Sequence, residues 1–156
     1  MNQLFHKSGK YLLLSVFLIA FLLSSCDDVN ENPFPDVQVY FTVNLIVDNE
    51  VSVPGNSIFF PGVGYGGIIT YCFQYDQYYA FDATCTYEIS PSCVVVKAEN
   101  PQLCPCLLDN FILTCPCCGS EFSAIDGSIL KGPASLPLKQ YNVAVFNNYT
   151  TLRIQN

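Results

Sequence analysis

Three thiols lie within four consecutive positions of the segment Cys115-Pro116-Cys117-Cys118-Gly119-Ser120. A further cysteine, Cys85, lies upstream of this segment, and Tyr87 follows it in the pattern Cys-x-Tyr. Thiolates are ligands for iron–sulfur clusters and for zinc, and paired thiols also form disulfides. The types and spacing of these residues therefore predict either a metal centre or a set of disulfides.

The remaining cysteines leave both kinds of chemistry open. Cys26 is followed by eight more: Cys72, Cys85, Cys93, Cys104, Cys106, Cys115, Cys117 and Cys118. In an exported domain an even number predicts disulfides, and eight cysteines allow 105 connectivities. Cys104 and Cys106 flank a single proline, and Cys117 and Cys118 are adjacent, so neither pair can close on itself without strain. Each of these cysteines must pair elsewhere or bind metal.

Residues 1–25 predict a lipoprotein signal peptide. Basic residues precede an apolar run over 11–23, which is too short to span a bilayer as a helix but suits a signal sequence. The run ends in Leu23-Ser24-Ser25-Cys26, which resembles a bacterial lipobox. We therefore expect lipidation of Cys26 and a location in the cell envelope, periplasmic or surface-exposed, with the lipid anchoring the chain to a membrane. The alternative is an ordinary secretory signal with Cys26 as a disulfide partner.

Residues 26–36 predict an acidic tether, and residues 37–156 predict a single domain. The tether holds four carboxylates and two prolines and has little apolar content to pack. From Cys26 onward, four basic residues face thirteen acidic ones, a net charge of −9 (4 − 13), which excludes nucleic acid as a partner. The basic segment at the N-terminus has no arginine, so it carries no twin-arginine signal, and we expect export of an unfolded chain.

The domain is predicted to be all-β, with short strands that deliver the cysteines. Alternating apolar and polar residues over 37–47 predict a half-buried strand. Residues 62–67 satisfy G-x-G-x-x-G, but a strand follows them rather than a helix, which predicts a turn and not a dinucleotide site. No later window has a helical period, so we expect a small β-sandwich or barrel of short antiparallel strands. Further strands are predicted over 68–73, 78–81, 94–97, 111–114, 121–124, 128–130, 141–146 and 150–154.

From about residue 67 to residue 154, the order of these parts resembles a Rieske [2Fe–2S] domain of the ferredoxin type. Residues 81–88 resemble its first cluster loop, and residues 115–122 resemble its second loop with the strand that follows. Residues 126–138 resemble the stretch that ends in the proline-rich loop covering the cluster. The resemblance implies a Rieske-like fold with cluster-type loops, a [2Fe–2S] cofactor, electron transfer, and a redox or envelope protein as partner.

Carried over by position, the resemblance implies metal ligands at Cys85 and Cys115, which match the two cysteine ligands. Tyr87 and Cys118 occupy the positions of the two histidine ligands. Cys117 matches a non-ligand cysteine that forms a disulfide between the loops in high-potential members.

The usual partner position of that disulfide is Ser90 in this chain, and the nearest cysteine is Cys93. Cys104 and Cys106, in a segment between the loops that is longer than in the family, are further disulfide candidates.

Three hypotheses follow, because the only histidine is His6, inside the predicted signal peptide. The first is a modified [2Fe–2S] centre on Cys85, Cys115 and Cys118, with Tyr87 or another cysteine such as Cys93 as the fourth ligand. The second is a structural zinc or iron site with four cysteine ligands. The third is a metal-free binding or interaction module stabilised by disulfides, in which Cys85 bonds to Cys115 or Cys118. Catalytic Ser/His/Asp and Cys/His arrangements need a histidine, so an independent enzyme is the least supported function.

Overall fold

The computed structural model describes residues 34–97 and 111–156. These residues contain ten short strands and one turn of 3₁₀ helix, joined by turns and loops. These residues belong to one unit, 33–156. In chain order the elements are β1 (Tyr40–Asn44), η1 (Asn49–Ser52), β2 (Ser57–Phe60), β3 (Ile68–Gln74), β4 (Gln77–Asp82), β5 (Val96–Lys97), β6 (Ile112–Thr114), β7 (Glu121–Ser123), β8 (Ile129–Lys131), β9 (Gln140–Phe146) and β10 (Thr151–Gln155).

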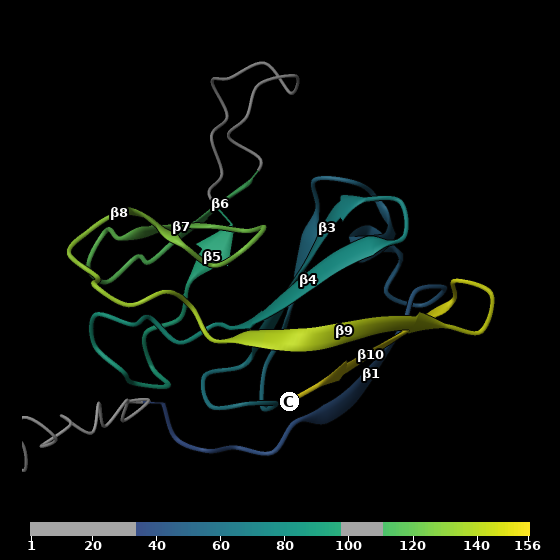
Figure 1. Cartoon of the computed structure of the whole chain (residues 1–156), viewed down its shortest axis with the longest axis horizontal. Helices are drawn as coiled ribbons and strands as arrows, with labels where there is room; N and C mark the ends of the chain where they lie inside the picture. Colours follow the sequence, from purple (N-terminus) through teal and green to yellow (C-terminus); the bar gives the residue numbers. More distant parts are fainter. Residues whose placement is uncertain (1–33, 98–110) are drawn as a thin grey trace, which may run out of the picture. The chain divides into compact units, whose positions relative to one another are not determined.

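The strands form two sheets, in which each strand pairing is antiparallel. The larger sheet has the order β1-β10-β9-β4-β3-β2, and the smaller has the order β5-β6-β7-β8 (Figure 1). Most neighbours in each sheet are consecutive in the chain, but β9 pairs with β4 and β10 pairs with β1. Through these two pairings, the C-terminal hairpin β9–β10 lies between β1 and β4, two strands from the N-terminal part of the domain.

The β3–β4 hairpin is buried on both faces, which explains its nearly continuous apolar sequence. In β3, Ile69 and Tyr71 belong to one buried cluster, whereas Ile68 and Cys72 belong to a second. The first cluster also includes Phe122 of the smaller sheet, so it joins the two sheets. Cys85, Cys93 and Cys115 are members of this first cluster, and the core of the domain therefore extends to the cysteine loops.

The predicted all-β architecture is confirmed. The strands predicted over 68–73 and 78–81, over 121–124 and 128–130, and over 141–146 and 150–154 form the hairpins β3–β4, β7–β8 and β9–β10. The strand predicted over 37–47 is shorter, but its alternation is real: Val39, Val43 and Leu45 are buried. β2 was not predicted. Its four residues follow a Pro-Gly-Asn turn and lack alternation, and only its pairing with β3 makes it a strand.

The glycine-rich segment 62–67 wraps around a buried carboxylate at the end of β4. The backbone N–H groups of Tyr65 and Gly66 donate hydrogen bonds to Asp82, at 2.8 and 3.2 Å. A Cβ on Gly66 would collide with Oγ1 of Thr84, so only glycine permits this approach. The segment is thus a structural turn, as its sequence context predicts, and it fixes the chain immediately before the first cysteine loop.

The predicted signal peptide, Cys26, Cys104 and Cys106 lie outside the described residues, as does most of the predicted tether. Among residues 34–97 and 111–156, no helix has the length and apolar character needed to cross a membrane.

Candidate metal centre

The segment Cys115–Ser120 is the loop of the β6–β7 hairpin. Two backbone hydrogen bonds close it, from Cys115 N–H to the Ser120 carbonyl and from Gly119 N–H to the Cys115 carbonyl, both 2.8 Å long. Gly119 has φ of +73°, a left-handed conformation that favours glycine. This turn buries the Cys115 side chain and leaves Cys118 half-buried and Cys117 exposed.

The first cysteine loop, residues 85–93, is closed at its base in a similar way. Cys85 N–H donates to the Cys93 carbonyl at 3.0 Å, and Thr84 pairs with Val94 in an isolated antiparallel bridge. Asp82 fixes the entry to the loop, because its carboxylate accepts hydrogen bonds from both the N–H (3.0 Å) and the hydroxyl of Thr84. Cys85, the first residue of the loop, is fully buried in the first core cluster.

The segment after β8 holds both cysteine loops in place. Thr86 of the first loop donates its hydroxyl to the Leu136 carbonyl. The fully buried hydroxyl of Ser120, in the second loop, accepts a hydrogen bond from Ala134 N–H at 2.9 Å. The proline-rich segment therefore bridges the two loops through one polar contact to each.

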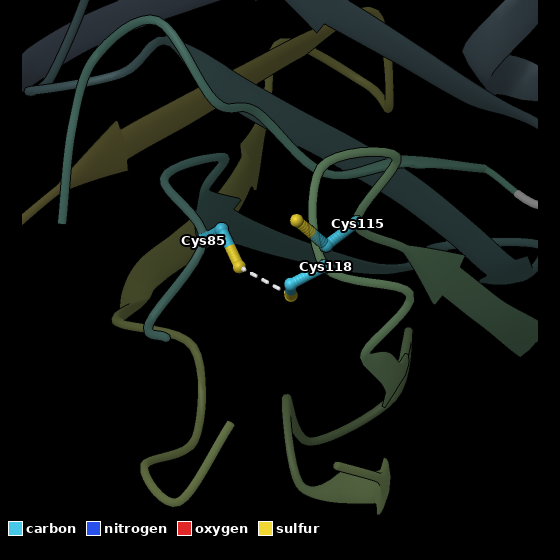
Figure 2. Close-up of side chains that lie close together, drawn as sticks. All are labelled: Cys85, Cys115 and Cys118. Carbon is cyan, nitrogen blue, oxygen red and sulfur yellow. Dashed lines mark hydrogen bonds between the residues drawn. The ribbon is translucent and has the colours of Figure 1, made fainter. Parts of the chain in front are cut away.

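Three free thiols meet where these loops face each other. The sulfur atoms of Cys85, Cys115 and Cys118 all lie within 4.8 Å of one another, and Cys85 Sγ is 3.5 Å from Cys118 Sγ. Figure 2 shows these side chains directed toward one another from the two loops. Two thiolates on one tetrahedral zinc ion lie about 3.8 Å apart, given Zn–S bonds of about 2.3 Å. The thiols are thus already close to the spacing that a single metal ion requires.

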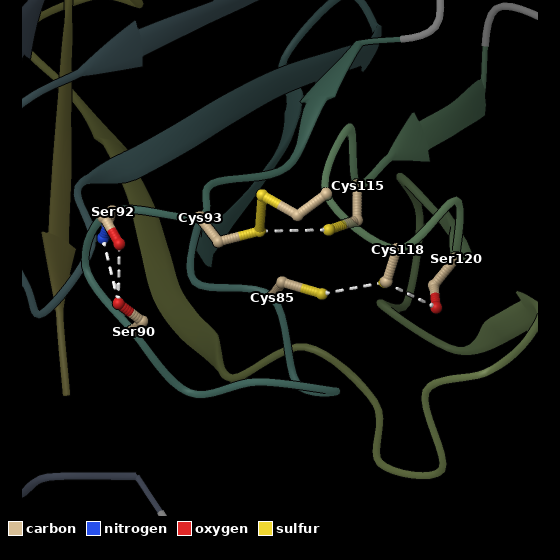
Figure 3. Close-up of a disulfide and its surroundings, with 8 residues drawn as sticks. Cys85, Ser90, Ser92, Cys93, Cys115, Cys118 and Ser120 are labelled. Carbon is tan, nitrogen blue, oxygen red and sulfur yellow. Dashed lines mark hydrogen bonds between the residues drawn. A yellow bond between two sulfur atoms is a disulfide. The ribbon is translucent and has the colours of Figure 1, made fainter.

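A disulfide joins the same two loops beside the free thiols. It links Cys93 to Cys117, across a sequence separation of 24 (Figure 3). The Cys93 sulfur lies 3.4 Å from the free Cys115 sulfur. The structure thus groups five of the cysteines into one bonded pair and three thiols. It does not bond Cys85 to Cys115 or Cys118, the pairings of the metal-free hypothesis.

The environments of Cys85 and Cys118 shift their pKa values in opposite directions. Burial raises the pKa of Cys85 to about 12, and hydrogen bonding to Cys115 contributes further. Burial also acts to raise the pKa of Cys118, but hydrogen bonds with the side chain and backbone of Ser120 outweigh it and lower this pKa to about 7. The Cys118 thiol donates a hydrogen bond to the Ser120 hydroxyl oxygen at 3.1 Å, and this hydroxyl can rotate to donate to the sulfur once Cys118 is ionised. Of Cys85 and Cys118, Cys118 is therefore the thiol that ionises more readily.

The remaining candidates differ in their positions. The backbone of Tyr87 hydrogen-bonds to Cys85, and the residue as a whole is 59% exposed to solvent. Cys72 is buried in the second cluster, apart from the three thiols.

Sequence reasoning did not assign a role to three residues that organise the site: Asp82, Thr86 and Ser120. Ser120 stands in the cysteine motif itself, so its position was a usable signal. The roles of the other two depend on partners far along the chain, including Tyr141 for Asp82 and Leu136 for Thr86.

Comparisons with known proteins agree with this architecture. No protein-family model matches the chain. A chain in the structure of the complex of reduced oxygenase and oxidized ferredoxin in carbazole 1,9a-dioxygenase superposes with a TM-score of 0.53 and 24% identity, over 76% of this chain and 94% of that one. The cyanobacterial plasma membrane Rieske protein PetC3 from Synechocystis PCC 6803 gives a TM-score of 0.48 and 25% identity, over 77% and 99% of the two chains.

One curated relative shares a short, well-matched stretch. The cytochrome b6-f complex iron-sulfur subunit 3 of Nostoc sp. (strain PCC 7120 / SAG 25.82 / UTEX 2576) is 59% identical over 34 residues. This stretch is 22% of this chain and 18% of that relative, so the chain spans less than a fifth of the relative that it matches. The described residues thus form an all-β domain with a Rieske-like, ferredoxin-type fold, and its cysteine cluster without histidine is consistent with a diverged ligand set.

Proposed function

We propose that this chain is an electron-transfer protein of the cell envelope whose redox centre is iron held by Cys85, Cys115 and Cys118. The observation that carries the proposal is the convergence of three free thiols within 4.8 Å in a Rieske-like fold. Electron transfer agrees with the fold, and the thiols supply ligands that iron accepts.

The ligand set distinguishes this centre from a Rieske cluster. A Rieske cluster has two histidines on one of its irons. The only histidine of the chain is His6, outside the domain, so the residues present do not fit that cluster. They do fit a thiolate-ligated iron centre, which needs one ligand beyond the three thiols. Tyr87 is the candidate for it, since its backbone already contacts Cys85.

Such a centre would exchange single electrons. The surrounding residues would determine how water and a redox partner reach it, and how the charge of the thiolates is stabilised. Cys85 and Cys115 are fully buried, which keeps water away from one side of the site. Cys118 is half-buried and therefore marks the side on which a redox partner would approach. Hydrogen bonds to the sulfur atoms, from Ser120 to Cys118 and from the Tyr87 backbone to Cys85, stabilise the thiolate forms.

We expect the purified protein to contain iron when it is isolated anaerobically, with absorption in the visible range. One iron without acid-labile sulfide indicates a mononuclear centre, and two irons with sulfide indicate a [2Fe–2S] cluster. Cys85→Ala and Cys118→Ala should each lower bound iron by more than about tenfold, because each removes a direct ligand. Tyr87→Phe should do the same only if the phenol is the fourth ligand.

Cys72→Ala is the matched control, since it also removes a buried thiol, but one outside the site. It should leave the iron content unchanged. Zinc in place of iron would instead favour the structural metal site. Protein without iron or zinc, from both anaerobic cytoplasmic expression and native export, would overturn the proposal in favour of a metal-free interaction module.

We further infer that Cys26 is lipidated and anchors the domain to an envelope membrane, where an oxidoreductase would be its partner. The support is the lipobox-like sequence and the apolar run that precedes it. Labelled fatty acid should be incorporated into the wild-type chain, and the protein should sediment with membranes. Cys26→Ala should abolish the label and release the protein into the soluble fraction. Membrane association without any label would point to another means of attachment.

A further inference from the structure

Cys85 and Cys118 are placed as a reactive pair as well as a pair of ligands. Their sulfur atoms are 3.5 Å apart, and a disulfide needs a separation of about 2.05 Å. Closing the pair therefore requires a movement of about 1.5 Å, shared between two loops. Figure 2 shows Cys85 extended toward Cys118 across the gap between these loops.

The Cys93–Cys117 disulfide lowers the entropic cost of closing this pair. Cys117 is adjacent to Cys118 in the chain, and Cys93 closes the same loop that begins at Cys85. The two loops are therefore joined before a second bond forms between them, so the second bond closes only a small ring. A small ring loses less chain entropy on closure than a large one.

The two thiols also differ in their access to solvent. Cys85 is fully buried, whereas Cys118 is half-buried between the exposed Cys117 and Gly119. An external reagent therefore meets Cys118 first, and Cys85 reacts from inside the protein. This is the arrangement of an attacking thiol with a resolving thiol behind it.

We propose that Cys85 and Cys118 form a second, reversible disulfide through exchange with an external disulfide, and that this bond closes the metal centre. The Cys118 thiolate attacks one sulfur of the external disulfide, whose S–S bond breaks and releases one thiol. Cys85 then gives up its proton and attacks the Cys118 sulfur as a thiolate, which breaks the mixed disulfide, and the second leaving group takes up that proton and departs as a thiol. The pair loses two electrons and two protons, and the external disulfide gains both as two thiols.

The same two sulfur atoms cannot be thiolate ligands and disulfide atoms at once. The exchange itself stands on the distance and the exposure of the pair, whereas its effect on iron rests on the proposed function. Oxidation would leave Cys115 as the only free thiol of the three, too few to hold a metal ion at this site. The centre would thus be loaded only while the pair is reduced.

The test is a redox titration of the metal-free full-length protein in glutathione buffers, followed by alkylation and peptide mapping. We expect the two thiols to disappear together, in a two-electron transition, with a Cys85–Cys118 cross-linked peptide as product. Cys118→Ser should abolish the cross-link, and Cys72→Ser should leave it unchanged. Separate glutathione adducts on the two thiols, or exchange that joins Cys93 to Cys115, would overturn the proposal.

Iron loading supplies the second measurement. Protein oxidised in this way should take up less than about a tenth of the iron that the reduced protein binds, and reduction of the pair should restore uptake. If the cross-link forms but the reduced protein binds no iron, the exchange stands and the proposed electron-transfer function fails. If the reduced protein binds iron but no cross-link appears, the function stands and the exchange is refuted.

Discussion

Replacing Asp82 with alanine is expected to lower the free energy of unfolding by about 3–5 kcal/mol. The buried carboxylate accepts hydrogen bonds from the N–H groups of Tyr65, Gly66 and Thr84 and from the hydroxyls of Thr84 and Tyr141. Alanine would leave these donors buried without an acceptor, which costs more than the hydrogen bonds themselves contribute. Urea denaturation of the metal-free protein measures the loss.

Tyr141→Phe is the matched control, because it removes only one of these donors together with its hydrogen bond. It should cost about 1 kcal/mol. A loss below about 1 kcal/mol for Asp82→Ala would show that water or a rearranged loop satisfies the donors, and that the carboxylate does not organise the first cysteine loop.

Removal of the Cys93–Cys117 disulfide, as the double variant Cys93→Ala and Cys117→Ala, is expected to cost about 2–4 kcal/mol of stability. The bond restricts the unfolded chain over a separation of 24 residues, and it joins the two loops that carry the free thiols. Thermal and urea unfolding measure the difference between the wild type with only this bond formed and the variant, with Cys85 and Cys118 reduced in both. The variant should also bind metal more weakly, because its loops are no longer linked.

Reduced wild-type protein provides the comparison for that variant. Its stability should fall to nearly the value of the double variant, since both lack the same bond. Equal stability of oxidised and reduced wild type would mean that the Cys93–Cys117 disulfide does not raise the free energy of unfolding above the value that the hairpin contacts alone supply. Cys72→Ala, which leaves the bridge intact, separates the effect of the disulfide from that of losing a buried cysteine side chain.

The strands could be predicted because their signals are local. Alternation in β1 and the Asp126-Gly127 turn between β7 and β8 need no knowledge of distant residues. β2 could not be predicted, because four residues after a turn become a strand only through pairing with β3. Local chemistry thus predicts elements with a strong pattern, and tertiary pairing decides the weak ones.

The meeting of the two cysteine loops was implied by family resemblance and not by the spacing of the cysteines. Spacing left the partner of Cys117 open, because Ser90 holds the usual position and Cys93 lies three residues further on. The structure pairs Cys93 with Cys117, and the hydrogen bond from the Cys85 N–H to the Cys93 carbonyl holds the two ends of the first loop together. Asp82 has no such signal, since a carboxylate at the end of a strand is ordinarily a solvent-exposed turn residue.

The Cys93–Cys117 bond also changes the covalent topology of the domain. It closes a ring that contains the whole chain from residue 93 to residue 117, including β5, β6 and Cys115. Cys85 and Cys118 lie on the two chain ends that leave this ring. Proteolysis at any one peptide bond within the ring would therefore open it without dividing the molecule, and all three free thiols would stay on one covalent framework.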